Sequence, residues 1–239
     1  MLPERVLILG GTNLARRVAD ALVARGVDVT SSLAGVTQHP LLPAGKLRVG
    51  GFGGVDGLRN YLRAEKVDLV IDATHPFAAQ ISANAIAAAE SLKLVRLAPE
   101  IWTEQPQDRW VACENIGAAV NALPDGIRVA ATVGRKEIAA FFARADLSGI
   151  ARMIELPPVD VPTNWILLQE RPPFSVEQEF ALFQEHRIQY LVSKNAGGAR
   201  AAKLDAAARL GIPVFMIARP TKAAVPTFYT IEDLLGSFL

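Results

Sequence analysis

Val6-Leu7-Ile8-Leu9-Gly10-Gly11-Thr12-Asn13-Leu14-Ala15-Arg16 is an apolar run followed by a glycine turn and the start of a helical pattern. A parallel α/β sheet holds a pyrophosphate with this layout, because glycines let the backbone approach the anion and a helix N-terminus presents free N–H groups. The match to the fingerprint G-x-G-x-x-G is degenerate, since Thr12 and Ala15 occupy the second and third glycine positions. The stretch alone therefore fits a nucleotide site and an ordinary tight turn equally well.

The bulk composition indicates a soluble intracellular protein. The chain has 239 residues, of which 51% are hydrophobic and 21% charged, and its formal net charge of +1 gives no reason to bind nucleic acid or an anionic membrane. The single cysteine, Cys113, excludes an internal disulfide and fits a reducing cytoplasm. We expect no signal peptide, and no apolar run approaches the roughly 20 residues of a membrane span.

Strands and helices are predicted to alternate along almost the whole chain, as in a parallel sheet covered on both faces. The first half is predicted to have strands at 6–9, 27–31, 47–49, 68–72 and 94–97 and helices at 13–25, 55–65 and 77–91. The second half is predicted to have strands at 128–133, 152–155, 165–169, 190–193 and 214–217 and helices at 115–123, 136–144, 176–186, 199–210 and from 230.

Residues 98–110, which contain Pro99 and Pro106, interrupt this alternation, and we interpret them as a crossover between two halves. The predicted fold class is α/β, with two Rossmann-like domains of mostly parallel sheets and a cleft between them. The predicted domains are residues 1–98 and residues 99–239. The glycine-rich stretch Gly50–Gly54 is a mobile lid or a loose connection from strand to helix, and we favour the second.

Ligands of open α/β sheets bind at the carboxyl ends of the strands, and four loops are predicted there. These loops are residues 10–12, 72–77, 132–136 and 193–198. The chain has three histidines, His39, His75 and His186. His75 stands beside Asp72 and Thr74, and this position fits a ligand contact as well as a structural role. The scattered histidines and the lack of a cysteine pair predict no metal site.

The end of the second strand favours NADP over NAD. An NAD site usually has an acidic residue about 20 residues after the first glycine, where it binds the ribose 2′-hydroxyl. Here the strand ends in Ser31 and Ser32, and Asp28 stands too early. Arg16 and Arg17 lie on the preceding helix. Two hydroxyls and an arginine suit a 2′-phosphate, although the same residues could simply complete a loop and a solvated helix face.

Tyr190 and Lys194 have the Y-x-x-x-K spacing of short-chain dehydrogenases, whose chemistry needs the two residues one helical turn apart, about 6 Å. This segment is predicted as a strand, in which four residues span roughly 13 Å. We therefore reject Tyr190 as a catalytic acid. Lys194, followed by Gly197 and Gly198, is either an anion-binding group at a helix start or a surface lysine in a turn.

Four blocks of sequence run in order from one end of the chain to the other. They are Leu7-Ile8-Leu9-Gly10-Gly11-Thr12-x-x-Ala15-Arg16, Asp72-Ala73-Thr74-His75-Pro76-Phe77-Ala78, Lys194-Asn195-x-Gly197-Gly198, and Lys203 through Gly211-Ile212-Pro213-Val214 to Arg219-Pro220. Together they resemble the precorrin-6A reductase family of cobalamin biosynthesis. The chain departs from that pattern at Ala196, where the family commonly has a serine, and at Asn13-Leu14, where a glutamate is frequent.

The resemblance implies an NADPH-dependent reductase that delivers hydride to C19 of the macrocycle precorrin-6A and reduces its C18=C19 double bond, giving dihydroprecorrin-6. It implies that residues 1–98 bind NADP and that residues 99–239 supply the substrate side of the cleft. The implied partner is a tetrapyrrole with many carboxylates, and hand-over of the macrocycle to other corrin-pathway enzymes is a further expectation. No nucleic acid, membrane or resident metal is expected.

The resemblance also distributes roles over the predicted loops. The implied cofactor residues are Gly10, Gly11 and Thr12 at the pyrophosphate, Arg16, Ser31 and Ser32 at the 2′-phosphate, and Thr74, His75 and Pro76 at the ribose or nicotinamide. The implied substrate residues are Arg135, Lys136, Lys194, Asn195, Gly197 and Gly198, because basic side chains and helix N-termini suit carboxylates. The catalytic candidates are Asp72, His75 and Lys194. The proton comes from one of them or from water, and we regard Asp72 as an orienting residue.

Three alternative interpretations remain. Another NAD(P)-binding Rossmann oxidoreductase would need a working Tyr–Lys pair on a helix. An NADP-sensing binding protein would need a DNA-binding helix or a large dimer face. A pyrophosphate-binding transferase would need an acidic pair for magnesium near the glycine turn. None of these features is visible in the sequence.

Overall fold

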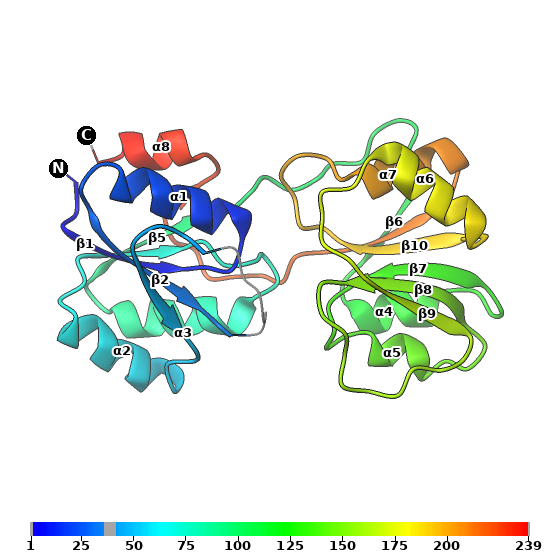
Figure 1. The fold of residues 1–239 in the computed structure, drawn as a ribbon, viewed down its shortest axis with the longest axis horizontal. Coiled ribbons are helices and arrows are strands. Elements are labelled where there is room, and N and C mark those ends of the chain that lie inside the picture. The colour runs from blue at the N-terminus through cyan, green and yellow to red at the C-terminus, as the bar shows by residue number, and fades with distance from the viewer. Residues whose placement is uncertain (1, 36–41, 239) are drawn as a thin grey trace. The chain divides into compact units, whose positions relative to one another are not determined.

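The computed structural model describes residues 2–35 and 42–238 and divides the chain into two compact units (Figure 1). Unit 1 comprises Met1–Glu100 and Pro220–Leu239, and unit 2 comprises Ile101–Arg219. The predicted domains divide the chain between residues 98 and 99, whereas the first segment of unit 1 ends at Glu100. The assignment of all of 99–239 to one domain is wrong, because the last twenty residues return to unit 1 and complete its sheet and helical layer.

Unit 1 is built on six parallel strands in the order β12-β5-β4-β1-β2-β3. The strands are β1 (Arg5–Leu9), β2 (Asp28–Leu33), β3 (Lys46–Val49), β4 (Leu69–Asp72), β5 (Lys93–Leu97) and β12 (Thr227–Phe228). The chain runs outward from β1 to β3 and then resumes at β4 on the other side of β1. The order therefore reverses between β1 and β4, the switch point at which α/β sheets bind ligands.

Helices cover both faces of this sheet. They are α1 (Asn13–Val23), α2 (Gly54–Ala64), α3 (Ala79–Ala89) and α8 (Ile231–Gly236). Figure 1 shows α1 and α8 on one face and α2 and α3 on the other. Alternate residues of β1 supply both cores: Ile8 packs with Leu22 and Leu234 under the first pair, and Leu7 packs with Leu58 under the second. A strand that is buried on both faces has a continuous run of apolar residues, and β1 could be predicted from the sequence for this reason.

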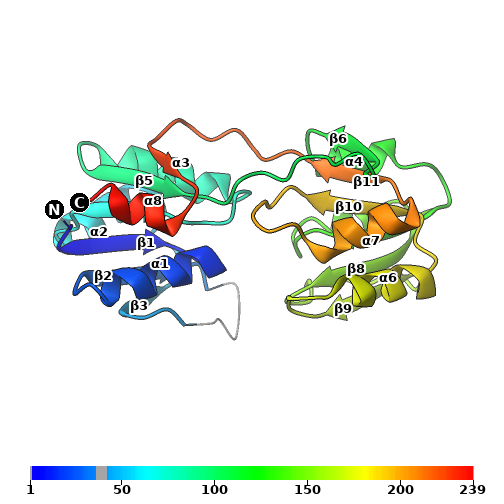
Figure 2. The same cartoon turned by 90° about the horizontal axis from the view of Figure 1, so that it is seen from above.

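Unit 2 repeats this order over five of its six strands; its sixth strand, at the edge where β12 lies in unit 1, is the first strand of the unit instead of the last. Its strands are β6 (Trp110–Cys113), β7 (Arg128–Thr132), β8 (Ser148–Met153), β9 (Trp165–Gln169), β10 (Tyr190–Lys194) and β11 (Val214–Ile217). They are all parallel in the order β6-β11-β10-β7-β8-β9, as Figure 2 shows. The helices are α4 (Ile116–Ala122), α5 (Ala139–Phe142), α6 (Val176–Glu185) and α7 (Ala202–Leu210). Here the order reverses between β7 and β10.

Several boundaries differ from the predicted ones, each for a local reason. The short edge strands β6 and β12 were not predicted, and α5 is shorter than the predicted 136–144. Strand β8 begins at Ser148 instead of residue 152, although Ser-Gly there resembles a turn. A Cβ on Gly149 would lie 2.0 Å from the Val129 carbonyl oxygen, so glycine lets β8 approach β7. Helix α7 begins three residues late, after Gly197 and Gly198 at φ +75° and +81°.

Candidate cofactor and substrate sites

The turn between β1 and α1 is fixed by hydrogen bonds to both neighbouring strand ends. The Gly10 N–H donates to the Ser32 carbonyl at 3.0 Å. Thr12 is the N-cap of α1: its hydroxyl oxygen accepts from the Ala15 N–H at 3.0 Å, and the hydroxyl donates to the Ala73 carbonyl at 2.9 Å. The turn is therefore tied to the loop after β4, and the N-terminus of α1 lies at the switch point.

The two glycines of this turn fit a phosphate group. A Cβ on Gly10 would lie 3.3 Å from the Ala15 Cβ, so the strand and helix approach closely there. Gly11 has φ +104°, which a residue with a side chain rarely adopts. Apart from Gly11 itself and its two chain neighbours, no atom of the described residues lies within 4 Å of the position of a Cβ on Gly11. That open space beside the helix N-terminus is where backbone N–H groups can meet an anion.

Two buried polar atoms near this turn have no hydrogen-bond partner among the described residues: the Ser31 hydroxyl and the Arg16 Nε. Ser31 is 2% exposed. Unsatisfied buried polar atoms cost free energy, so a ligand oxygen that engages them stabilises the site. Ser31 shares the α1 face of the sheet with Val29, whereas Ser32, its strand neighbour, points to the opposite face. The structure thus groups Arg16 with Ser31 on one face and separates Ser32 from them.

Arg48, which the sequence analysis did not select, lies beside Ser32 in the register of β2 and β3. Its guanidinium lies 3.7 Å from the centroid of the Phe52 ring. It donates to the carbonyls of Gly50 at 2.6 Å and Gly51 at 2.8 Å. The glycine-rich stretch Gly50–Gly54 is therefore held by a side chain of the strand that precedes it. Arg48 could have been selected from the sequence, because it is an arginine on the strand next to a predicted phosphate site.

Asp72, at the end of β4, is 2% exposed and engaged by two partners. The Thr74 hydroxyl donates to its Oδ1 at 2.7 Å, and Arg96 Nε donates to its Oδ2 at 3.3 Å. Burial alone would raise the pKa of Asp72, but hydrogen bonds from Thr74 and Ser82 and the charge of Lys222 outweigh it and lower the pKa. An ionised carboxylate at neutral pH orients its neighbours and has no proton to donate.

The two residues after Thr74 differ in accessibility. Pro76 is buried, whereas His75 is exposed. The Nδ1 of His75 accepts from the Phe77 N–H at 3.3 Å, and the two rings lie 5.8 Å apart. This arrangement fixes the ring at the carboxyl end of β4. His186 caps the C-terminus of α6 in unit 2, and His39 lies outside the described residues.

In unit 2 the loops after β7 and β10 meet through an ion pair. Lys194 Nζ donates to Glu137 Oε1, and the lysine side chain is 14% exposed. In the same loop Arg135 pairs with Glu155 at 3.3 Å, and Lys136 is exposed. The structure therefore brings together the basic residues that the sequence predicted at this switch point.

The Asn195 side chain has a structural partner. Its Oδ1 accepts from the Trp102 N–H and its Nδ2 donates to the Trp102 carbonyl, both at 2.9 Å. This reciprocal pair occupies the amide, so Asn195 shapes the following turn through Trp102. The Gly198 carbonyl accepts from Trp102 Nε1 at 3.0 Å, so the backbone N–H groups of Gly197 and Gly198 are the part of the turn proposed to approach a ligand.

Lys203, in the first turn of α7, was not selected as a site residue either. Its Nζ donates to Thr132 Oγ1 at 2.7 Å, at the end of β7. Burial lowers the pKa of Lys203 to about 8, with Arg152 lowering it further and Glu179 opposing. Lys203 lies three and four residues before the buried Ala206 and Ala207, on one face of α7. A lysine on the apolar face of a predicted helix was the available signal.

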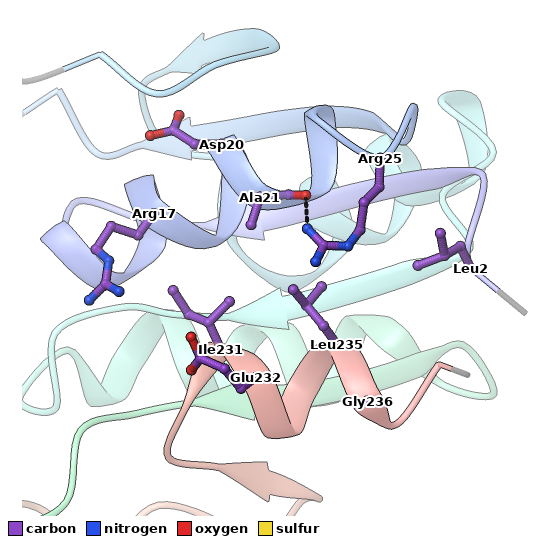
Figure 3. A pocket seen from close by; sticks show the side chains of 9 residues that line it. All are labelled: Leu2, Arg17, Asp20, Ala21, Arg25, Ile231, Glu232, Leu235 and Gly236. Carbon is purple, nitrogen blue, oxygen red and sulfur yellow. Dashed lines mark hydrogen bonds between the residues drawn. The ribbon is translucent and has the colours of Figure 1, made fainter.

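A groove of about 680 Å³ lies between α1 and α8, away from these loops (Figure 3). Leu2, Ile231 and Leu235 supply apolar contacts, and Arg25 at its rim donates to the Ala21 carbonyl at 2.8 Å. Arg17 lines this groove, so the two successive arginines of α1 face different surroundings. The described residues hold no cluster of three metal-ligating side chains, and none of their helices is long and apolar enough to cross a membrane.

Comparison with known proteins places this fold and these loops in one family. Residues 5–238 match the family described as precorrin-6x reductase CbiJ/CobK. The chain belongs to the precorrin-6x reductase family. This reductase is 47% identical to the precorrin-6A reductase of Rhodococcus erythropolis, with 98% of this chain and 95% of the relative covered. It is 42% identical to the precorrin-6A reductase of Rhodobacter capsulatus, with 97% and 94% covered.

A solved structure, CobK precorrin-6A reductase, resembles this reductase with a TM-score of 0.92 at 40% identity, and the match covers 98% of this chain and 95% of that one. The resemblance inferred from the four sequence blocks is confirmed, as is the α/β class with two parallel-sheet halves. The family is one of oxidoreductases, so the transferase and sensor interpretations are set aside.

Proposed function

We propose that this reductase uses NADPH to reduce precorrin-6A, with hydride delivered to C19 and the C18=C19 double bond reduced. The observation that carries the cofactor part is the glycine turn at the switch point of unit 1. Beside it lie the buried Ser31 hydroxyl and Arg16 Nε, which have no hydrogen-bond partner among the residues that the structure describes. The substrate part is supported by family membership. NADPH supplies the hydride, and the protein supplies orientation and electrostatics.

The residues of unit 1 divide the cofactor between them. Gly10, Gly11 and Thr12 receive the pyrophosphate with backbone N–H groups and the helix N-terminus. Arg16 and Ser31 bind the 2′-phosphate, which satisfies their unpartnered atoms, and Ser32 shapes the strand end from the opposite face. Thr74, His75 and Pro76 line the ribose or nicotinamide. Asp72 holds the Thr74 hydroxyl and thereby orients this last group.

Reduction of a carbon–carbon double bond requires a proton as well as a hydride. Asp72 is ionised and hydrogen-bonded, which removes it from the donors that the sequence left open. The proton then comes from His75, Lys194 or water. His75 is exposed at the end of β4, whereas Lys194 is held by Glu137.

Unit 2 supplies basic groups for the carboxylates of the macrocycle. Arg135, Lys136 and Lys194 are its candidates, together with the backbone of Gly197 and Gly198. Asn195 contributes to this site indirectly, because its hydrogen bonds with the Trp102 backbone stabilise the turn that contains Gly197 and Gly198. Arg135 and Lys194 are paired with Glu155 and Glu137, so a substrate carboxylate replaces or joins an existing acidic partner.

Relatives named precorrin-6A reductase are 41–47% identical to this chain. Relatives named cobalt-precorrin-6A reductase are 27–29% identical. This difference supports precorrin-6A itself as the substrate. Hand-over to other corrin-pathway enzymes and a cytoplasmic location stay predictions.

Titration with NADPH and NADH tests the proposal, with nicotinamide fluorescence as the readout. We expect NADH to bind at least tenfold more weakly, about 1.4 kcal/mol. Arg16→Met should weaken NADPH about tenfold and leave NADH unchanged, because the arginine meets only the 2′-phosphate. Arg17→Met is the matched control, since Arg17 lines the groove between α1 and α8, and it should change neither affinity. Equal binding of NADPH and NADH by the wild-type protein would contradict the assignment.

A further inference from the structure

The segment that returns from unit 2 to unit 1 makes side-chain and backbone contacts with the end of the sheet. Lys222 Nζ donates to Ser82 Oγ of α3 at 2.8 Å. The Ala223 carbonyl accepts from Arg96 Nη1 at 3.2 Å, and the Pro226 carbonyl accepts from the Arg96 N–H at 2.8 Å. Residues about 140 positions apart in the chain therefore meet beside the end of β4.

Counting protons gives this contact a direction. The only hydroxyl proton of Thr74 is donated to Asp72 Oδ1 at 2.7 Å, so Thr74 Oγ1 can serve Ser82 only as an acceptor. The Ser82 and Thr74 hydroxyl oxygens lie 3.4 Å apart. Ser82 in turn accepts from the Lys222 ammonium, which is a donor only. Ser82 has one proton, and the Ala78 carbonyl at 3.2 Å and Thr74 Oγ1 at 3.4 Å are both within reach of it. The side chains of Lys222, Ser82, Thr74 and Asp72 thus form a continuous series of polar contacts from a cation to an anion.

We propose that Lys222 is a positioning residue for the turn Thr74–Pro76, acting through Ser82 and Thr74 on the part of unit 1 assigned to the nicotinamide side of the cofactor. The inference rests on the proposed function for its readout, because the turn is assigned to NADPH there. It adds that a residue of the C-terminal segment, outside the predicted nucleotide domain, governs how well that turn is held.

The alternative partner of Ser82 shows what loss of Lys222 would do. Ser82 Oγ also lies 3.2 Å from the Ala78 carbonyl, one turn earlier in α3. The ammonium occupies a lone pair of Ser82 Oγ and so directs the Ser82 proton toward the Ala78 carbonyl or Thr74. Without the ammonium, the Ser82 hydroxyl is no longer held in this orientation beside Thr74. Ser82 is 1% exposed and Thr74 is 7% exposed, so water has little access to replace the ammonium.

The charge of Lys222 acts on Asp72 as well. It lowers the pKa of Asp72, together with the hydrogen bonds that oppose burial. Arg96 of β5 contacts the other carboxylate oxygen, and the exposed His75 lies three residues along the same loop. Removing Lys222 raises the pKa of Asp72 and leaves the Arg96 contact in place. The loss of cofactor affinity on acidification, here called the acid limb, therefore occurs at a higher pH.

The test measures NADPH affinity by nicotinamide fluorescence at pH 7, with kcat and KM alongside, and follows the acid limb from pH 3 to 8 by calorimetric titration with NADP+, which is stable in acid. Lys222→Met should weaken NADPH about tenfold, the order of one charge-assisted hydrogen bond, with a smaller change in kcat. Its acid limb should move to higher pH, which a purely structural loss would not cause. Lys222→Arg should restore affinity and the acid limb, because it returns a cationic donor.

Two further variants separate the possible outcomes. Ser82→Ala should weaken NADPH as Lys222→Met does, and the double variant should be no weaker than either, since all break one chain. Lys93→Met removes an exposed lysine of unit 1 that lies 5.0 Å from the Phe238 ring, and it should have no effect. Failure of the wild-type protein to bind NADPH would overturn the proposed function. Tight binding by the wild type and by Lys222→Met alike, with the same acid limb, would overturn this inference alone.

Discussion

The two units share the order of five strands around the switch point and differ in the turn and helix that come after the first strand there. In unit 1, β1 leads through Gly10 and Gly11 into an eleven-residue helix capped by Thr12. In unit 2, β7 leads into a turn with Arg135 and Lys136 and then a four-residue helix with no side-chain cap. The same topology therefore offers a helix N-terminus in one unit and basic side chains in the other.

The strands on the other side of each switch point, β4 in unit 1 and β10 in unit 2, also differ in the residues at their ends. Leu9 is paired in register with Asp72 in unit 1, and Thr132 is paired with Ser193 in unit 2. The residue after Ser193 is Lys194. The strand after the switch point therefore ends in the anionic Asp72 in unit 1 and in the cationic Lys194 in unit 2. Buried apolar strands determine the topology, whereas a few polar residues at the strand ends determine which ligand each unit suits.

Among substitutions that remove the difference between the two strand ends, we expect the largest effect at Asp72, on the free energy of unfolding. Asp72→Asn leaves Arg96 without its carboxylate in a buried site and should lower the free energy of unfolding by about 3 kcal/mol. The pKa of Asp72 is lower in the folded protein than in the unfolded chain, so its contribution is complete above about pH 4 and is lost on further acidification. Urea denaturation at pH 7 and pH 3 should therefore show a difference between variant and wild type that shrinks at the lower pH.

Lys194→Met is the matched change in unit 2. Its partner Glu137 is 32% exposed, so this pair is better solvated and its loss should cost about 1 kcal/mol or less. A larger loss from Lys194→Met than from Asp72→Asn would contradict the account of the two strand ends.

Most of the fold could be predicted because its strands are buried on both faces. Strands β1, β4 and β10 are nearly continuous apolar runs, and the predicted positions agree within one or two residues. Strand β6 is a short apolar run, but it begins inside residues 98–110, which were interpreted as a crossover, and β12 has only two residues. Residues 220–239 were assigned to the wrong unit because nothing local distinguishes the sheet to which a two-residue strand adds.

The candidate site could be predicted where one loop holds several polar residues in sequence, as from Asp72 to Pro76. Residues that reach the site from elsewhere were missed. Arg96 lies in a predicted strand and Lys203 in a predicted helix, and each contacts a strand-end residue only after folding. Lys222 lies in the segment between β11 and β12 and contacts Ser82 of α3. Asn195 was placed at the correct turn, but its partner Trp102 lies 93 residues away and could not be inferred.

The glycine turn provides the next test of the contrast. An alanine at Gly11 would be strained at φ +104° by about 2 kcal/mol, so the turn of the free protein relaxes. NADPH binding must then restore the strained turn, and Gly11→Ala should weaken NADPH by up to about thirtyfold. The control is Gly134→Ala in the corresponding turn of unit 2, where the three atoms nearest to a Cβ all belong to the flexible carboxylate of Glu137. Fluorescence titration should show unchanged NADPH affinity for the control, and an equal loss in both variants would mean that the cofactor is not confined to unit 1.

The smallest effect expected is at Lys203, the buried cation of unit 2. Its pKa is about 8 in the folded protein and about 10.4 in an unfolded chain. Between those pH values the unfolded chain binds more protons than the folded protein, so this lysine makes the free energy of unfolding rise with pH. Below pH 8 the lysine is charged in both states, and the cost of burying its charge is complete. Lys203→Met removes this cost together with the bond to Thr132, and at pH 7 it should be no less stable than wild type, with a gain of up to about 1 kcal/mol. That gain should vanish by pH 10 in urea denaturation. Lys46→Met, at a lysine 67% exposed on the edge of unit 1, should show no such trend, and an identical pH dependence in the two variants would place the Lys203 charge in solvent.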